Sequence, residues 1–225
     1  MMRTLLILLL IPSLAFSAVD ESICYGTTNN GKLVGGVKLP DSGNNFQSYS
    51  SIGNLIGRTY IHSKVKNVIL NSYQKLKSNA PGKVFMYGET GWKNGDRFKP
   101  HKTHQNGLSV DFMVPVLKAG KSVYLPTSPL NKFGYGIEFD EQGKFAEYYI
   151  DFEAMAAHLV ELHKEARAQN IAIWRVIFAP ELQPWLFQTK YGEYLKQNLE
   201  FSKKRSWVRH DEHYHVDFAV DCQKM

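Results

Sequence analysis

Apolar side chains recur along this chain with two spacings, and each spacing predicts a different kind of element. Over residues 63–76 and 151–169 they return every three or four positions, which favours amphipathic helices. Ser63 is a candidate N-cap for the first of these runs, and Asp151 begins the second. A shorter helix is expected over 188–199. Segments rich in β-branched and aromatic residues predict strands over 83–88, 108–116, 171–178 and 213–220.

The segments between these elements are polar or rich in turn-forming residues. We expect an irregular lead-in over 26–51 with short extended pieces, a polar loop over 89–100, a long excursion with a hairpin over 118–146, and a turn over 180–184. The chain contains no internal repeat, low-complexity segment or interdomain linker. Few short strands therefore alternate with helices, which predicts an α+β fold with a small sheet covered by helices.

The first seventeen residues have the pattern of an export signal. Arg3 gives a short positive start, the stretch from Leu5 to Leu14 is apolar, and Ala15-Phe16-Ser17 supplies small residues at a cleavage site. The apolar stretch is shorter than the about 20 residues that span a bilayer, so cleavage after Ser17 is favoured over a retained anchor. The prediction is a signal peptide over 1–17, followed by one domain over 18–225 without membrane insertion.

Only two cysteines are present, Cys24 and Cys222, close to the two ends of the predicted mature chain. An even pair in an oxidising compartment favours a disulfide, which would tie the N-terminal segment to the last strand. The formal net charge is +6, which suits an anionic polymer or surface. Because no cluster of Arg and Lys accompanies this charge, nucleic-acid binding is not favoured.

The first of two histidine clusters contains His101 and His104. Asn106-Gly107 bends the chain after them, so that His104 can meet Asp111 on the following strand. Alternation places Asp111 on the face opposite its apolar neighbours. A buried acid there is costly unless it is paired or binds a cation. The alternative is a half-exposed strand on which Asp111 faces water.

The second cluster contains His210, His213 and His215 near the C-terminus. Strand alternation puts His213, His215 and Asp217 on one face and apolar residues behind them. The alternative is a polar strand face that carries histidines without a function. Two histidines and one aspartate form a catalytic zinc set whose fourth position is open to water. Together with a nearby base, this composition indicates a metal-dependent hydrolase.

The spacing of these residues resembles the metallopeptidase superfamily of lysostaphin, the D-Ala-D-Ala peptidases and the hedgehog domain. The shared pattern stands here as His104, six residues, Asp111, and later His213-Tyr214-His215. Within it, the chain is most similar to penicillin-insensitive murein endopeptidases over about half its length. Their first motif is matched by Arg97-Phe98-x-x-His101-x-Thr103-His104-Gln105-x-Gly107-Leu108-x-Val110-Asp111, and their second by His210-Asp211-x-His213-x-His215-Val216.

The resemblance implies a fold and a role for each residue of the two motifs. The fold would be a small, mainly antiparallel sheet flanked by helices. His104, Asp111 and His215 would bind zinc, His213 would be the catalytic base, and His101 and His210 would bind or orient substrate. The family usually has a second acid where this chain has Ser109. Glu212 is a second candidate base, as in the D-Ala-D-Ala branch, but His213 is favoured because it shares a strand face with His215.

The implied function is a periplasmic, zinc-dependent endopeptidase that hydrolyses D,D peptide cross-links in peptidoglycan. Two alternatives stay open: a D-Ala-D-Ala carboxypeptidase or L,D-endopeptidase with the same fold, and a zinc-containing protein that binds cell wall without cutting it. Tyr87, Trp92 and Phe98 precede the first motif and either line a substrate cleft or pack within the loop. Peptidoglycan is the one partner that the sequence indicates, and protein partners stay unassigned.

Overall fold

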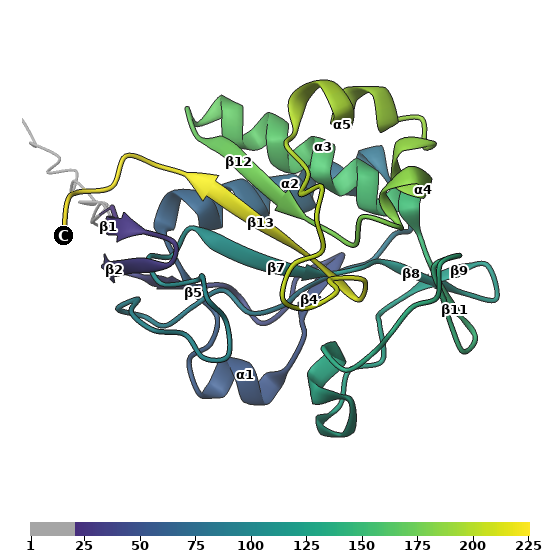
Figure 1. Ribbon diagram of the computed structural model, residues 1–225, viewed down its shortest axis with the longest axis horizontal. Coiled ribbons are helices and arrows are strands. Elements are labelled where there is room, and N and C mark those ends of the chain that lie inside the picture. The colour runs from purple at the N-terminus through teal and green to yellow at the C-terminus, as the bar shows by residue number, and fades with distance from the viewer. Residues whose placement is uncertain (1–20) are drawn as a thin grey trace, which may run out of the picture.

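A five-stranded sheet lies at the centre of the structure, a computed structural model that describes residues 21–225 (Figure 1). Its strand order is β12-β13-β7-β6-β4, and all neighbours are antiparallel except β4 and β6. The strands span Ala172–Ile177 (β12), His213–Ala219 (β13), Ser109–Met113 (β7), Phe85–Tyr87 (β6) and Phe46–Ser48 (β4). This arrangement confirms the prediction of an α+β fold with a mainly antiparallel sheet.

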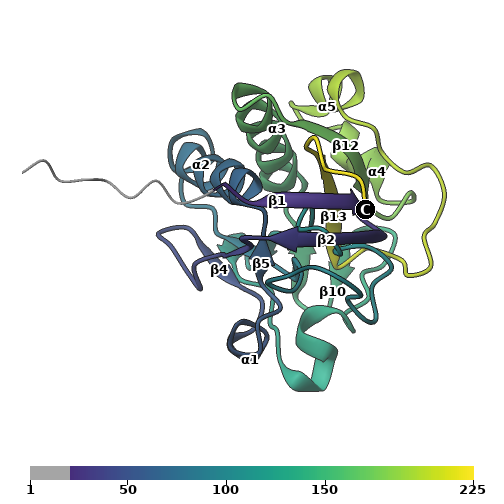
Figure 2. The same cartoon turned by 90° about the vertical axis from the view of Figure 1, so that its left-hand side faces the viewer.

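Two long helices, α2 (Ser63–Asn79) and α3 (Phe152–Ala168), pack together over one face of this sheet (Figures 1 and 2). The predicted apolar face of α2 is buried: Val65, Val68, Ile69 and Leu76 are all fully inaccessible. Helix α3 is buried on most of its circumference because it contacts α2, β12 and two short helices, α4 (Gln183–Phe187) and α5 (Gly192–Asn198). The hydrophobic core therefore lies between the sheet and this helical layer.

The ends of the helices agree only in part with the sequence-based prediction. Asp151 caps α3, since its carboxylate accepts a hydrogen bond from the backbone of Ala154 at 3.0 Å. Helix α2 is capped by His62 instead of Ser63, because Nδ1 of His62 accepts from the backbone of Lys64 at 3.2 Å. Ser63 is already the first helical residue, and it exchanges hydrogen bonds with Ser22.

The segment after β12 differs from the prediction. The turn predicted over 180–184 is wrong in its last two residues, because 183–187 form α4, and the helix predicted over 188–199 begins later, as α5 at Gly192. Pro184 suggested a break, but it stands in the first turn of α4, where a missing backbone N–H has no cost.

Several small elements surround the main sheet. A hairpin of β1 (Ile23–Thr27) and β2 (Asn30–Val34) occupies the predicted irregular lead-in, followed by β3 (Val37–Lys38), α1 (Ser51–Leu55) and β5 (Tyr60–Ile61). The predicted hairpin of the long excursion is present as β8 (Val116–Lys118) and β9 (Lys121–Val123). The 3₁₀ segment η1 (Pro129–Gly134) follows, and then β10 (Lys144–Phe145) and β11 (Tyr148–Ile150).

The two ends of the described chain meet beside the first hairpin. Cys24 and Cys222 form the predicted disulfide, and the backbone of Gly26 donates to Gln223 at 2.9 Å. Figure 2 shows the C-terminal end lying against β1. The predicted signal peptide, 1–17, lies outside the described residues. Within 21–225, no helix combines the length and apolar character needed to cross a membrane.

Candidate metal centre in the cleft

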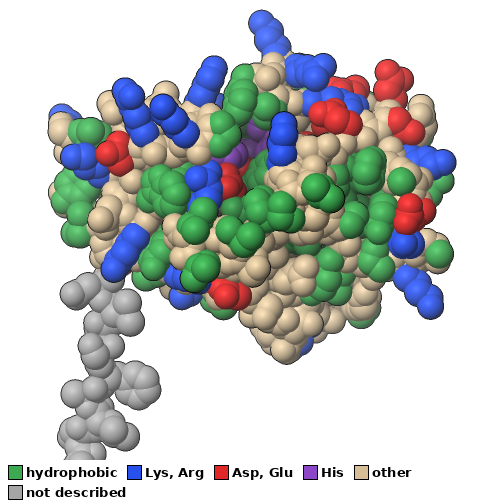
Figure 3. All heavy atoms as spheres, turned by 90° about the horizontal axis from the view of Figure 1, so that it is seen from below, with side chains coloured by type: hydrophobic (Ala, Val, Ile, Leu, Met, Phe, Trp, Pro, Cys, Tyr) green, Lys and Arg blue, Asp and Glu red, His purple; other side chains and the backbone are tan. Residues whose placement is uncertain are grey.

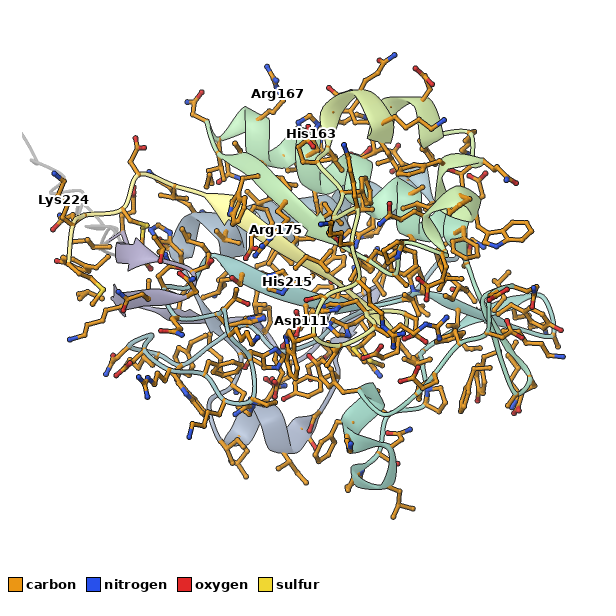
Figure 4. All side chains as sticks on the ribbon, viewed as in Figure 1. Asp111, His163, Arg167, Arg175, His215 and Lys224 are labelled. Atoms are coloured by element: carbon orange, nitrogen blue, oxygen red, sulfur yellow. A yellow bond between two sulfur atoms is a disulfide. The ribbon has the colours of Figure 1, made fainter. Side chains whose placement is uncertain are left out.

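The histidines of the last strand and the aspartate of the first motif meet on the face of the sheet that the helices leave free. Strands β13 and β7 pair so that His215 lies opposite Asp111. Tyr214, between the two histidines of β13, points the other way and contacts His158 of α3. The alternation predicted from the sequence therefore holds on both strands, and Figure 4 shows Asp111 and His215 side by side on neighbouring strands.

Asp111 is completely buried at the centre of this cluster. Its Oδ1 atom lies 2.8 Å from Nδ1 of His215, 3.3 Å from Nε2 of His104 and 3.9 Å from Nε2 of His213. Burial by itself raises the pKa of Asp111, but the surrounding histidines hold that pKa well below its usual value. Asp111 is therefore a carboxylate on which several imidazoles converge, as at a metal site.

His104 is held in a conformation that leaves one ring nitrogen available. Its backbone has a φ of 69°, in the left-handed region that non-glycine residues rarely adopt. Nδ1 lies 3.2 Å from the carbonyl oxygen of Thr90, to which it donates, so that Nε2 carries the lone pair. Nε2 is buried without a hydrogen-bond partner. A buried nitrogen of this kind is costly unless a cation or a water molecule occupies the space before it.

His101 lies beside His104, anchored by an acid that the sequence did not suggest. Its Nε2 atom is 2.6 Å from Oε2 of Glu89, and its Nδ1 is 3.7 Å from Oδ2 of Asp111. Glu89 is in turn held by the guanidinium of Arg58, whose Nη2 donates to Oε2 at 2.9 Å. Burial raises the pKa of Glu89, but Arg58 and His101 outweigh it and lower the pKa to about 2. Glu89 is thus ionised and orients His101 toward Asp111.

His213 and Glu212 form a second pair at the end of β13. Nδ1 of His213 lies 2.8 Å from Oε1 of Glu212, while Nε2 points toward Asp111. Because β13 begins only at His213, Glu212 is free of the strand alternation that would turn it away. His210 packs against His213, with ring centroids 4.7 Å apart, and has a φ of 59°. Burial lowers the pKa of His210 to about 4, so that its ring is neutral near pH 7.

Tyr135 completes the surroundings of Asp111. Its hydroxyl donates to Oδ2 of Asp111 at 3.0 Å and accepts from the backbone of Glu89 at 2.9 Å. Gly88 makes room for this contact, because a Cβ there would lie 2.6 Å from the Tyr135 hydroxyl. Sequence reasoning missed Tyr135, Glu89 and Arg58. No sequence pattern indicates that Tyr135 belongs to the site, and Glu89 and Arg58 lie outside both histidine motifs.

The donor set fits a metal ion. His101, His104 and Asp111 each offer a ligand atom, and these atoms lie within 4.8 Å of one another. This group shares His104 and Asp111 with the predicted zinc set, and it contains His101 where the prediction has His215. His215 nevertheless contacts Asp111 through Nδ1. Imidazole nitrogen with carboxylate oxygen is the ligand chemistry of zinc and related divalent ions, and the partnerless Nε2 of His104 is the atom such an ion would satisfy.

The cluster lies in a cleft of about 1020 Å³. Its walls come from the β1–β2 turn, loop 100–103, strand β12, the segment after η1, and loop 205–212. Figure 3 shows histidine side chains at the bottom of this hollow, with basic side chains around it. Tyr87, Trp92 and Phe98 do not line the cleft: Tyr87 and Phe98 are fully buried, and Trp92 packs on Phe98. The loop-packing alternative is therefore correct for Trp92 and Phe98, whereas Tyr87 belongs to strand β6 and is buried there.

A comparison with protein families decides where the chain belongs. The sequence model of the penicillin-insensitive murein endopeptidases matches residues 24–224. The chain belongs to this family. The match extends over almost all of the described residues, well beyond the half of the chain covered by the resemblance of the two motifs. No curated protein matches the chain. Family membership identifies the protein as a peptidoglycan endopeptidase.

Proposed function

We propose that the protein is a zinc-dependent, periplasmic endopeptidase that hydrolyses D,D peptide cross-links in peptidoglycan. His104, Asp111 and His215 hold the zinc ion in this proposal, and His213 is the general base. The observation that carries it is the convergence of His104, His213 and His215 on one buried carboxylate, Asp111, at the bottom of a cleft. Zinc bound there would polarise a scissile carbonyl and lower the pKa of a water molecule.

The contacts of His213 support its role as base over Glu212. A base needs a lone pair aimed at the reacting atoms, and Nε2 of His213 is the atom of this pair that faces Asp111. Glu212 accepts a hydrogen bond from Nδ1 of His213, which holds the proton on Nδ1 and leaves Nε2 free. Nε2 would take a proton from the attacking water and return it to the leaving amine. Glu212 is then the residue that orients the base.

The charge of the cleft supports an anionic peptide as substrate. The acidic side chains of its outer lining all have partners: Glu89 with Arg58, Glu138 with Arg209, and Glu212 with His213. Three basic side chains of the lining, Lys102, Lys132 and Arg205, are exposed and form no ion pair within residues 21–225. Peptidoglycan stems carry free carboxylates, which these cations attract. His101 and His210 flank the metal ligands and would bind or orient the peptide.

Endopeptidase chemistry requires room on both sides of the scissile bond, and the cleft of about 1020 Å³ is lined by segments from several parts of the fold. Its lining includes the β1–β2 turn, on the left in Figure 1, and the segment after η1, below and to the right of the central sheet. A carboxypeptidase needs a closed end on one side instead. Export by the predicted signal peptide would place this cleft in the periplasm, where peptidoglycan lies.

Digestion of purified peptidoglycan tests the proposal, with and without a chelator, followed by mass analysis of the muropeptides. The proposal expects loss of cross-linked dimers and a matching gain of monomers, abolished by chelation and restored by zinc. Release of single D-alanine residues would establish the carboxypeptidase alternative. Undiminished activity in the chelator would refute the metal requirement, and zinc binding without any cleavage would establish a binding protein.

A further inference from the structure

Asp217 is a buried acid next to the candidate metal centre that neither sequence motif includes. It lies on β13, two positions after His215 and on the same face of the sheet. Its side chain has no exposed surface. A buried carboxylate is costly unless its oxygens are hydrogen-bonded and its charge is compensated, so the contacts of Asp217 indicate what it does.

Both oxygens of Asp217 are engaged. Oδ1 lies 2.9 Å from Nε2 of His215 and accepts a hydrogen bond from the Ser109 hydroxyl at 2.6 Å. Oδ2 accepts from Nε of Arg175 at 2.9 Å and also from Nη2 of the same guanidinium. The three partners come from three neighbouring strands, β13, β7 and β12. The pairing of these strands therefore fixes the position of the Asp217 carboxylate. Figure 4 shows Arg175, His215 and Asp111 in succession across the sheet.

The hydrogen bond to Nε2 determines which side of the His215 ring faces the cluster. An imidazole that binds a metal through one nitrogen carries its proton on the other, and an acceptor for that proton fixes the ring. Here Asp217 accepts at Nε2, and Nδ1 is left 2.8 Å from Oδ1 of Asp111. We propose that Asp217 is a positioning residue of the metal centre: it holds Nε2–H of His215 and thereby presents Nδ1 to the metal.

This inference rests on the proposed function, because it takes His215 as a ligand. It also accounts for Ser109, where the chain departs from the motif that it resembles. Ser109 lies directly across the ladder from Asp217 and donates to it. A carboxylate is therefore present at this point of the sheet, supplied by β13 instead of β7.

The competing interpretation is that Asp217 only neutralises Arg175. The guanidinium of Arg175 lines the cleft and stacks on Trp174, with 4.3 Å from its Cζ atom to the ring centroid. An ion pair of this kind would stabilise β12 against β13 without any effect on the metal. The two interpretations differ in what happens when Arg175 is replaced and Asp217 is kept.

Zinc affinity of the mature protein, measured by competition with a chromophoric chelator, separates them. We expect Asp217→Ala to weaken zinc binding about 10- to 100-fold, the usual effect of losing a partner behind a ligand histidine. Asp217→Asn keeps an oxygen acceptor for Nε2–H and should recover part of the loss. Arg175→Gln leaves Asp217 in place and should bind zinc nearly as the native chain does. Circular dichroism of the metal-free variants establishes that each is folded.

Nuclear magnetic resonance of isotope-labelled His215 measures how fast its Nε2–H proton exchanges with water, a quantity that a change in overall stability alone does not alter. In the zinc-loaded native chain and in Arg175→Gln, the Nε2–H proton should exchange slowly with water, and in Asp217→Ala it should exchange fast. Equal losses of zinc affinity in Arg175→Gln and Asp217→Ala would overturn the inference and leave a structural ion pair. The variant His215→Ala distinguishes a failure of the proposed function from a failure of this inference. If His215→Ala keeps native zinc affinity, the proposed ligand set is wrong. If His215→Ala loses zinc affinity while Asp217→Ala keeps it in full, only the role of Asp217 is refuted.

Discussion

Acid sensitivity of the core should depend on one histidine, His158 of α3. This residue is fully buried between the sheet and α2, where it stacks on Tyr73 and contacts Phe112. Nδ1 is hydrogen-bonded to the hydroxyl of Tyr214, and Nε2 is buried without a partner. Protonation would therefore create a charge in an apolar site together with an N–H that has no acceptor. Burial accordingly lowers the pKa of His158 from 6.5 to about 3.

The sign and size of the effect follow from this shift. The unfolded chain takes up a proton at His158 below pH 6.5, while the folded chain resists it down to a pKa of about 3. The free energy of unfolding is therefore unaffected above this range and falls as the pH is lowered through it. At about pH 4.5 the loss is about 2.7 kcal/mol, because each pKa unit is worth about 1.4 kcal/mol. A value of this size is a large part of the stability of a typical domain.

Urea unfolding of the metal-free protein at about pH 7.5 and about pH 4.5 measures this loss, with His158→Gln as the variant that does not titrate. Other titrating groups are common to both proteins and cancel in the comparison. We expect the pH-dependent loss of stability to be smaller by about 2.7 kcal/mol in the variant. The same pH dependence in both proteins would refute the assignment of a buried neutral histidine.

Three further changes should have defined effects. Replacing Cys24 and Cys222 by Ser removes a bridge between residues 198 positions apart, and urea unfolding should show a loss of stability of up to about 5 kcal/mol. His213→Gln should lower kcat about 10²- to 10⁴-fold, and elemental analysis should show that zinc is retained. Glu212→Gln should lower kcat less, because this substitution removes only the partner that orients His213. A larger loss of kcat in the Glu212 variant would make Glu212 the base. Gly88→Ala should displace the Tyr135 hydroxyl and cost about 1–3 kcal/mol in thermal unfolding, with weaker zinc binding; unchanged binding would show that this contact does not support the site.

Strand and helix periodicity predicted the parts of the structure whose residues are close in sequence. Alternation placed His213 and His215 on one face, as the register of β7 and β13 confirms, and the bend at Asn106-Gly107 brought His104 within 3.3 Å of Asp111. The disulfide was predictable because the chain has only two cysteines. These features were predictable because each depends on a local sequence pattern, or, for the disulfide, on there being only one possible pair of cysteines.

Other features depend on contacts between distant segments of ordinary composition. Tyr135 reaches Asp111 from a long excursion between strands, and no spacing distinguishes it from other tyrosines of the chain. The pair of Arg58 and Glu89 joins two loops 31 positions apart. Helix α4 was missed because Pro184 is typical both of a turn and of a first helical turn, and packing against α3 decides between them.

Anomalous diffraction at the zinc absorption edge, measured on crystals of the zinc-loaded protein, locates the metal and so tests the proposed zinc site directly. We expect one strong peak in contact with Nε2 of His104, the carboxylate of Asp111 and Nδ1 of His215, with Nε2 of His213 facing the open side of the ion. A peak bound by His101, His104 and Asp111, with His215 still hydrogen-bonded to Asp111, would contradict the proposed ligand set. The absence of any peak at Asp111 would contradict the metal centre itself.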